Sequence, residues 1–117
     1  MPIVRSQDRA VLVRGPRFPT LQRLVDRAGG SDSVTVLINV FASSAEEVPE
    51  HTHEVEEVLV VVDGECVITV DGRPVAARAG DAVIVTPGAR HSISHESDER
   101  CQVVAILASP DVQIGTK

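Results

Sequence analysis

Residues 51–64 read HTHEVEEVLVVVDG. Two histidines and a glutamate precede a β-branched run that ends in Asp-Gly, and such a run between turn signals predicts a β-strand. Side chains two residues apart on a strand share a face. If the strand begins near His51, the side chains of His51, His53 and Glu57 converge. Glu54 and Glu56 have the opposite parity, and we expect them to face solvent.

Short β-branched runs separated by turn signals fill most of the chain. Asp-Gly pairs at 63–64 and 71–72 are hairpin signals, so residues 55–78 are predicted to form a three-stranded meander. No stretch keeps a helical periodicity for more than two turns. The pattern predicts an all-β fold, a small antiparallel barrel or sandwich. We expect strands at residues 11–14, 21–26, 33–41, 55–62, 65–70, 74–78, 82–86, 91–95 and 101–107.

The other two histidines, His91 and His95, follow the segment GDAVIVTPGAR at residues 80–90. A Pro-Gly pair turns the chain there, so His91 opens a strand that could lie antiparallel beside the first histidine pair. A third imidazole would complete a set of nitrogen donors with one carboxylate, which suits Fe, Mn, Ni, Co or Zn better than Ca or Mg. Such a set leaves open coordination positions, as a catalytic metal requires.

The first histidine segment resembles the first motif of the cupin family, which consists of small metal-binding β-barrels. Three residues separate His53 from Glu57, and six separate Glu57 from Gly64, as in the family. In the second motif, Gly80, Gly88 and His91 are in register. The resemblance covers residues 45–95, and the flanking strands fit the fold.

Three positions depart from the family pattern. Ala45 stands where a glycine is usual, Thr86 where a proline is usual, and His95 where an asparagine is usual. Pro87 keeps the turn chemistry beside Thr86. None of the three positions is a metal ligand in the family, so the departures bear on the substrate and leave the metal site intact.

The resemblance implies a double-stranded β-helix, or jelly roll, with one divalent transition metal in the barrel mouth. The ligands would be His51, His53, Glu57 and His91. Fe(II) is the favoured ion, and Mn, Ni, Zn and Co are the alternatives. Glu57 could also leave the metal and serve as a general base.

Two further polar residues have open alternatives. His95 has the parity of His91 and could assist the metal ligands, contact substrate or relay a proton. We favour a position in solvent at the strand end. Asn39 shares a face with Thr35 and Leu37, and it could contact a ligand if that face is inward. The opposite face is also apolar, so the sequence leaves the choice open.

Composition narrows the class of partner. The 117 residues carry a net charge of −6, which disfavours nucleic acid as the main partner. We expect one domain over residues 1–117, with residues 1–30 as an arginine-rich N-terminal arm or edge strands. That arm carries about +4 and the remainder −10. We expect Cys66 and Cys101 to be reduced and buried, and the protein to be cytoplasmic without membrane contact.

Three functions remain open at this point. The first is dioxygenase-type oxidation of a small organic substrate at a mononuclear metal. The second is non-oxidative isomerase, cyclase or lyase chemistry at the same metal. The third is a cupin that binds a small ligand without catalysis, because a fold does not fix a function. In each case apolar edge strands favour a homodimer.

Overall fold

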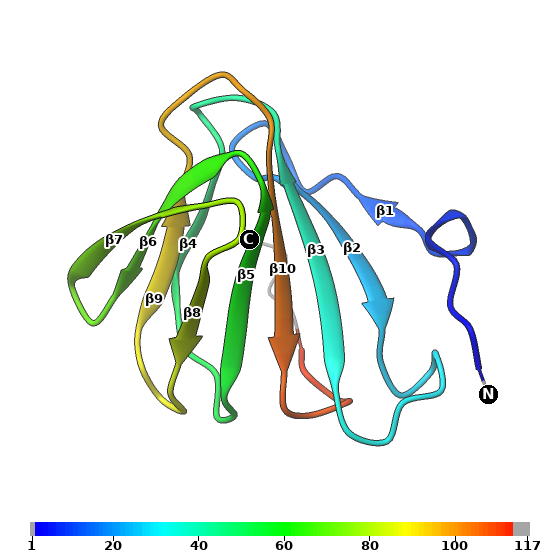
Figure 1. Ribbon diagram of the computed structural model, residues 1–117. Helices are drawn as coiled ribbons and strands as arrows, with labels where there is room; N and C mark the ends of the chain where they lie inside the picture. Colours follow the sequence, from blue (N-terminus) through cyan, green and yellow to red (C-terminus); the bar gives the residue numbers. More distant parts are fainter. Residues whose placement is uncertain (1, 114–117) are drawn as a thin grey trace.

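The computed structural model describes residues 2–113. These residues form ten β-strands and one short 3-10 helix, with no α-helix among them (Figure 1). No helix in this described part is long and apolar enough to cross a membrane. The elements are η1 (Ser6–Asp8), β1 (Val11–Leu12), β2 (Thr20–Val25), β3 (Thr35–Phe41), β4 (Glu47–His51), β5 (Glu57–Asp63), β6 (Glu65–Val70), β7 (Arg73–Arg78), β8 (Ala82–Val85), β9 (His91–Ser94) and β10 (Cys101–Leu107).

The strands form two antiparallel sheets that pack against each other as a jelly roll (Figure 1). The larger sheet has the order β1-β2-β3-β10-β5-β8, and the smaller one has the order β4-β9-β6-β7. The all-β prediction is therefore confirmed. The hydrogen-bonded pairs leave two separate sheets, and side chains fill the space between them.

The predicted meander over residues 55–78 is half wrong. β6 and β7 do pair as a hairpin, with Asp71 and Gly72 both at positive φ in the turn. β5, however, pairs with β8 and β10, and at Gly64 the chain crosses to the other sheet. A Cβ at Gly64 would collide with the backbone carbonyl of Arg100, so the crossing requires glycine.

The first histidine segment is not one strand, so the condition that a strand begins near His51 and continues to Glu57 is not met. His51 ends β4 in the smaller sheet, residues 52–56 connect the sheets, and Glu57 begins β5 in the larger sheet. The sequence gives little sign of β4, because Pro49 and exposed glutamates interrupt the alternation of apolar and polar residues. A strand at the edge of its sheet tolerates both.

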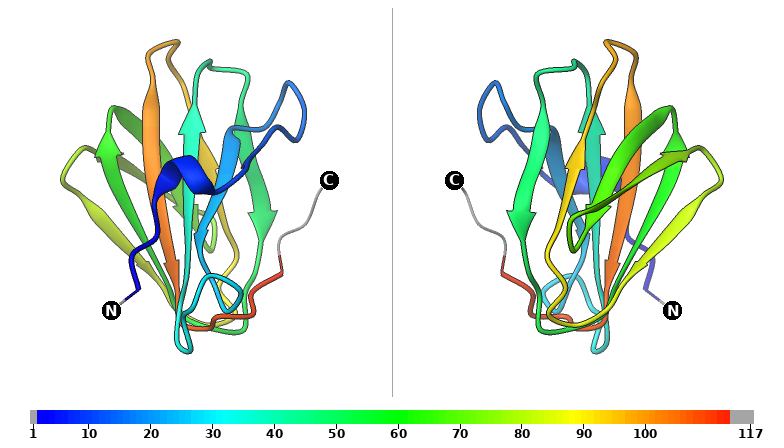
Figure 2. Two further views of the ribbon diagram at one scale, coloured as in Figure 1. Left: turned by 90° about the vertical axis from the view of Figure 1, so that its right-hand side faces the viewer. Right: turned by 90° about the vertical axis from the view of Figure 1, so that its left-hand side faces the viewer.

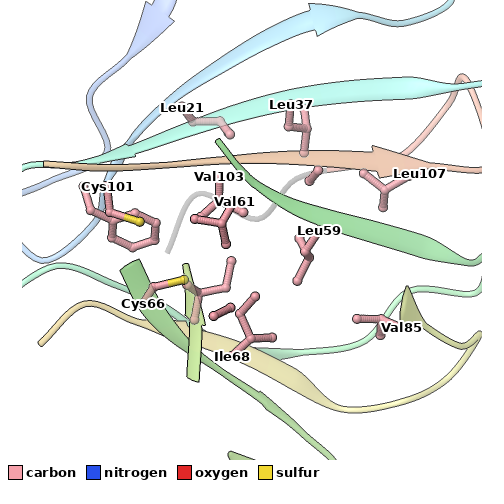
Figure 3. Close-up of a cluster of buried hydrophobic side chains, with 14 of the residues drawn as sticks. Leu21, Leu37, Leu59, Val61, Cys66, Ile68, Val85, Cys101, Val103 and Leu107 are labelled. Atoms are coloured by element: carbon pink, nitrogen blue, oxygen red, sulfur yellow. The ribbon is translucent and has the colours of Figure 1, made fainter. Parts of the chain in front are cut away.

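The core lies between the sheets, where aliphatic side chains from both of them meet (Figure 3). One part of it, the Phe41 cluster, consists of Phe41, Cys66, His95 and Cys101, all at most 5% exposed. Both thiols are free and buried, and contact with Cys101 together with burial raises the pKa of Cys66. The two cysteines therefore behave as small buried side chains, as expected.

The first part of the N-terminal arm, around η1, lies on the outer side of β2, which is itself part of the arm (Figure 2). Gln22 on β2 donates hydrogen bonds to the carbonyls of Ser6 and Arg9. Arg9 and Arg23 form ion pairs with Asp26. Part of the basic charge of this arm is thus neutralised within the chain itself.

Candidate metal centre

Three neighbouring elements bring four potential ligands together. His51 ends β4, His91 begins β9, and the two residues are direct partners in the antiparallel pairing of these strands. His53 lies in the connection after β4, and Glu57 is the first residue of β5. The donor atoms of all four lie within 4.8 Å of one another. We call this group the His/Glu cluster, and it is the ligand set expected from the sequence.

Backbone carbonyls orient two of the imidazoles. His51 Nδ1 lies 2.8 Å from the Pro49 carbonyl, and His91 Nδ1 lies 3.0 Å from the Ala89 carbonyl. A carbonyl accepts only, so each Nδ1 carries the proton and donates it. This fixes the tautomer with a lone pair on Nε2, which is the atom that faces the cluster.

The contact between His91 and Glu57 is one that a cation would stabilise. His91 Nε2 lies 2.8 Å from Glu57 Oε1, and both atoms are buried. Neither makes a hydrogen bond of acceptable geometry with any described residue. A lone pair and a carboxylate oxygen this close repel each other unless a proton or a metal ion lies between them. The residues present therefore fit a divalent transition metal held by three imidazoles and one carboxylate.

The pKa values of the three histidines shift in different directions. Burial is the main cause that lowers the pKa of His51 and of His53, so both are neutral at pH 7. Burial also acts to lower the pKa of His91, but the adjacent Glu57 and the Ala89 carbonyl outweigh it and raise that pKa. Without a metal, the His91–Glu57 pair is thus the place where a proton binds most readily.

A cavity of about 670 Å³ opens next to the cluster. Its walls combine aliphatic residues, with Leu21, Leu37 and Leu59 among them, and polar residues that include the His/Glu cluster. Its volume is in the range of small-molecule sites. Asn39 lines it and is 6% exposed, which answers the question that the sequence left open. The inward face of β3 is the one that carries Thr35, Leu37 and Asn39.

Arg14 also lines the cavity, and the sequence did not single it out. It comes from the N-terminal arm, some forty residues before the histidines, and no motif marks it. Burial lowers its pKa. The only sequence feature next to Arg14 is the Gly15-Pro16 pair that follows it. Such a pair indicates a turn of the chain and does not indicate a binding residue.

His95 lies away from the cluster. It is 2% exposed, so the solvent position that we favoured is wrong. Its Nδ1 lies 2.9 Å from the Ser43 carbonyl, and its ring centroid is 5.6 Å from that of Phe41. Three residues separate it from His91, a distance of about 13 Å along an extended strand. It is not among the described residues that line the cavity. Glu54 and Glu56 are exposed, as predicted.

A comparison with known protein families shows to which family the chain belongs. A profile described as the cupin domain matches residues 39–107, which include all four residues of the His/Glu cluster. The chain belongs to the cupin family. The chain is also 31% identical over 87 residues to a protein named Beta-D-galactosidase Rv1717 from Mycobacterium tuberculosis, and the match covers 74% of each chain.

Solved structures support the same fold for this cupin. The polyketide cyclase RemF from Streptomyces resistomycificus superimposes with a TM-score of 0.77 at 22% identity, covering 97% of this chain and 84% of RemF. A predicted oxalate decarboxylase from Thermotoga maritima gives a TM-score of 0.73 at 19% identity, covering 92% of this chain and 98% of that chain. At these identities the likeness establishes the fold alone.

Proposed function

We propose that this cupin is a metal-dependent enzyme that converts a small organic substrate at one divalent transition metal. The observation that carries the proposal is the convergence of three imidazoles and Glu57 beside a cavity of about 670 Å³. Four protein donors leave open positions on a six-coordinate metal, and the cavity gives a substrate access to them.

Dioxygenase-type oxidation with Fe(II) is the first reaction to test. Such an ion, when bound, would supply activation of O2 and polarisation of a substrate oxygen. The chain itself would contribute orientation and proton transfer. Glu57 is buried and its Oε1 makes no hydrogen bond of its own, so this oxygen can accept a proton from a substrate hydroxyl or carbon acid. The aliphatic side chains of Leu21, Leu37 and Leu59 would provide an apolar contact for the carbon skeleton of the substrate.

Non-oxidative chemistry is the second candidate. The same base and metal would serve an isomerisation, cyclisation or decarboxylation that begins with removal of a proton. The names of the two structural relatives, a polyketide cyclase and a predicted oxalate decarboxylase, favour this alternative. The galactosidase name of the sequence relative adds hydrolysis to the same non-oxidative class.

The two candidates separate in one experiment. The protein is loaded with Fe(II) in air or with Zn(II) under nitrogen, and each form is incubated with a panel of phenols, diketones, hydroxy acids and glycosides. Substrate-dependent O2 uptake, lost in Glu57→Ala, is the expected result. Turnover by the Zn(II) form alone would select the second candidate. No turnover by either loaded form would contradict the proposal of an enzyme.

We further propose that this cupin is a homodimer through the outer face of the larger sheet. On β3, β5 and β10, buried residues alternate with aliphatic residues that face outward. The N-terminal arm covers this face over β2. Elsewhere the face leaves Val62, Ile84 and Ile106 between 37% and 64% exposed. A second copy of the chain, packed face to face about a two-fold axis, would cover these side chains.

Light scattering tests the homodimer. We expect twice the mass of one chain for the protein and for Val75→Lys, which alters an exposed aliphatic residue of the smaller sheet. The double variant Ile84→Lys, Ile106→Lys should be monomeric, because it places two charges on the proposed interface. A monomeric wild-type protein at working concentration would contradict the proposal.

A further inference from the structure

Arg14 lines the same cavity as the His/Glu cluster and is unpaired there. Its Nε and Nη2 atoms are buried, and neither has a hydrogen-bond partner among residues 2–113. A guanidinium group keeps its charge under all physiological conditions, and burying it without partners costs free energy. An unsatisfied cation at a substrate cavity is therefore a feature that a ligand can explain.

The surrounding chain holds Arg14 over the cavity. Its guanidinium carbon lies 5.2 Å from the centroid of the Phe18 ring, within the range of a cation–π contact. A turn closed by the hydrogen bond from Phe18 N to the Gly15 carbonyl keeps the two side chains adjacent. Glu47 N, at the start of β4, donates to the Arg17 carbonyl and ties this turn to the smaller sheet. The side chain is thus positioned before any ligand arrives.

The free edge of Arg14 has the geometry that binds a carboxylate. Nε and Nη2 donate in parallel, as a fork that matches the two oxygens of a carboxylate. Arg27 of the same chain uses these two atoms in this way, with Nε 2.7 Å from Asp111 Oδ1 and Nη2 2.8 Å from Asp111 Oδ2. At Arg14 the same edge is buried and makes no hydrogen bond to any residue that the structure describes.

The charges around the cavity favour an anion. Besides the imidazoles, the charged side chains that line it among the described residues are Arg14, Glu50 and Glu57. Glu50 is exposed at the rim, where water screens it. Glu57 belongs to the metal ligands, and its charge would be outweighed by a divalent ion. With such an ion bound, the interior of the cavity would carry a net positive charge in a protein whose net charge is −6.

We propose that Arg14 binds the carboxylate of the substrate, which would make the substrate a small organic acid with a second oxygen directed at the metal. Asn39 lies on the inward face of β3, lines the same cavity and can donate a further hydrogen bond to such an acid. This inference rests on the proposed function for the metal-bound oxygen, but the carboxylate contact depends on Arg14 alone. Arg14 is therefore a residue that determines specificity.

Calorimetric titration with matched acids and amides tests the inference. The probes are glycolate, pyruvate, malonate and salicylate, each compared with its uncharged amide, added to protein loaded with Co(II). We expect at least one acid to bind at least about tenfold more tightly than its amide, the size expected for a charge-assisted hydrogen bond. Arg14→Gln should remove that preference and leave the affinity for the amide unchanged. A shift of the Co(II) visible spectrum would show that a second oxygen of the acid binds the metal.

Arg17→Gln is the matched control, because Arg17 is exposed in the same turn. It should bind the acids as the wild-type protein does. Equal affinities for acids and amides in the wild-type protein would overturn the inference, as would unchanged acid binding in Arg14→Gln or a failure of all four acids to bind. The acid–amide comparison needs no variant, so it stands even if Arg14→Gln unfolds. If the protein takes up no Co(II), the proposed function fails. Acid binding to the metal-free protein that depends on Arg14 would still support the carboxylate contact.

Discussion

His91 begins β9 and His95 directly follows its last residue, Ser94, and the surroundings of the two histidines differ. In both residues Nδ1 faces a backbone carbonyl, and in both Nε2 is buried without a hydrogen-bond partner among the described residues. The Nε2 atom of His91 meets Glu57 and two further imidazoles beside a cavity. The ring of His95 packs against Phe41. An oriented, buried imidazole is therefore not enough for a metal site, and the convergence of several donors distinguishes one end of the strand from the other.

The largest expected difference is in Zn(II) affinity, between a variant with asparagine at His91 and one with asparagine at His95. We expect His91→Asn to weaken binding of Zn(II) by at least the roughly 10–100-fold that loss of an outer-shell partner of a metal ligand costs. His95→Asn should leave the affinity unchanged, since His95 does not face the cluster. Competition with a chromophoric chelator measures both affinities. Equal losses in the two variants would contradict the distinction between the two ends.

The free energy of unfolding should depend more on the Phe41 cluster than on the walls of the cavity beside the His/Glu cluster. Phe41 is completely buried in the Phe41 cluster, so Phe41→Ala should lower the free energy of unfolding by about 3–5 kcal/mol. Leu37 lines a cavity that already exists, and Leu37→Ala should cost about 2–3 kcal/mol because less new void is created. Urea unfolding of the metal-free proteins measures both values. A larger loss for Leu37→Ala would show that the cavity walls carry more of the stability than this account assigns to them.

Replacing either of two glycines by alanine should also lower the stability, by different amounts. Gly64 and Gly72 both have positive φ, but only at Gly64 would a Cβ meet backbone atoms. Gly72→Ala should cost about 1 kcal/mol, from the unfavourable conformation alone. Gly64→Ala should cost more, because the Arg100 backbone must also move. Similar thermal melting temperatures for the two variants would argue against the close approach at the crossing.

The smallest expected effect is on the pKa values of the three histidines in the His/Glu cluster. In the metal-free protein we expect His91 to titrate above the ordinary value of 6.5, and His51 and His53 to titrate below it. A raised pKa in the folded state means that His91 adds stability below pH 6.5 and that this contribution disappears as the pH rises through its folded pKa. The lowered pKa values of His51 and His53 act in the opposite sense, so their contribution is lost as the pH falls below 6.5. NMR titration of the imidazoles tests the order, and in Glu57→Gln the pKa of His91 should fall.

The sequence predicts much of the fold because alternation and turn signals are local properties. β6 and β10 have the predicted bounds, and the other predicted strands differ from the observed ones by at most two residues at either end. Pairing between sheets is not local. The Asp63-Gly64 turn therefore indicated a hairpin, although the chain crosses from one sheet to the other there. β4 was missed because an edge strand with proline and glutamates lacks the usual pattern.

The metal ligands were predictable for a different reason. Histidine and glutamate at fixed spacing identify the motif whatever the strands around it do. The four residues named from the sequence therefore lie together, although they do not share a single strand. Arg14 and the burial of His95 depend on contacts between segments far apart in the chain. No spacing within the sequence encodes such contacts, and only the fold brings them together.

Metal content tests the central claim most directly. The protein would be purified without a histidine tag or chelator and analysed for transition metals together with His51→Ala and His95→Ala. This account predicts close to one Fe, Mn, Ni, Co or Zn per chain in the wild-type protein and in His95→Ala, and a loss of that metal in His51→Ala. A protein that holds no metal and takes none up on reconstitution would contradict the account, as would full metal content in His51→Ala.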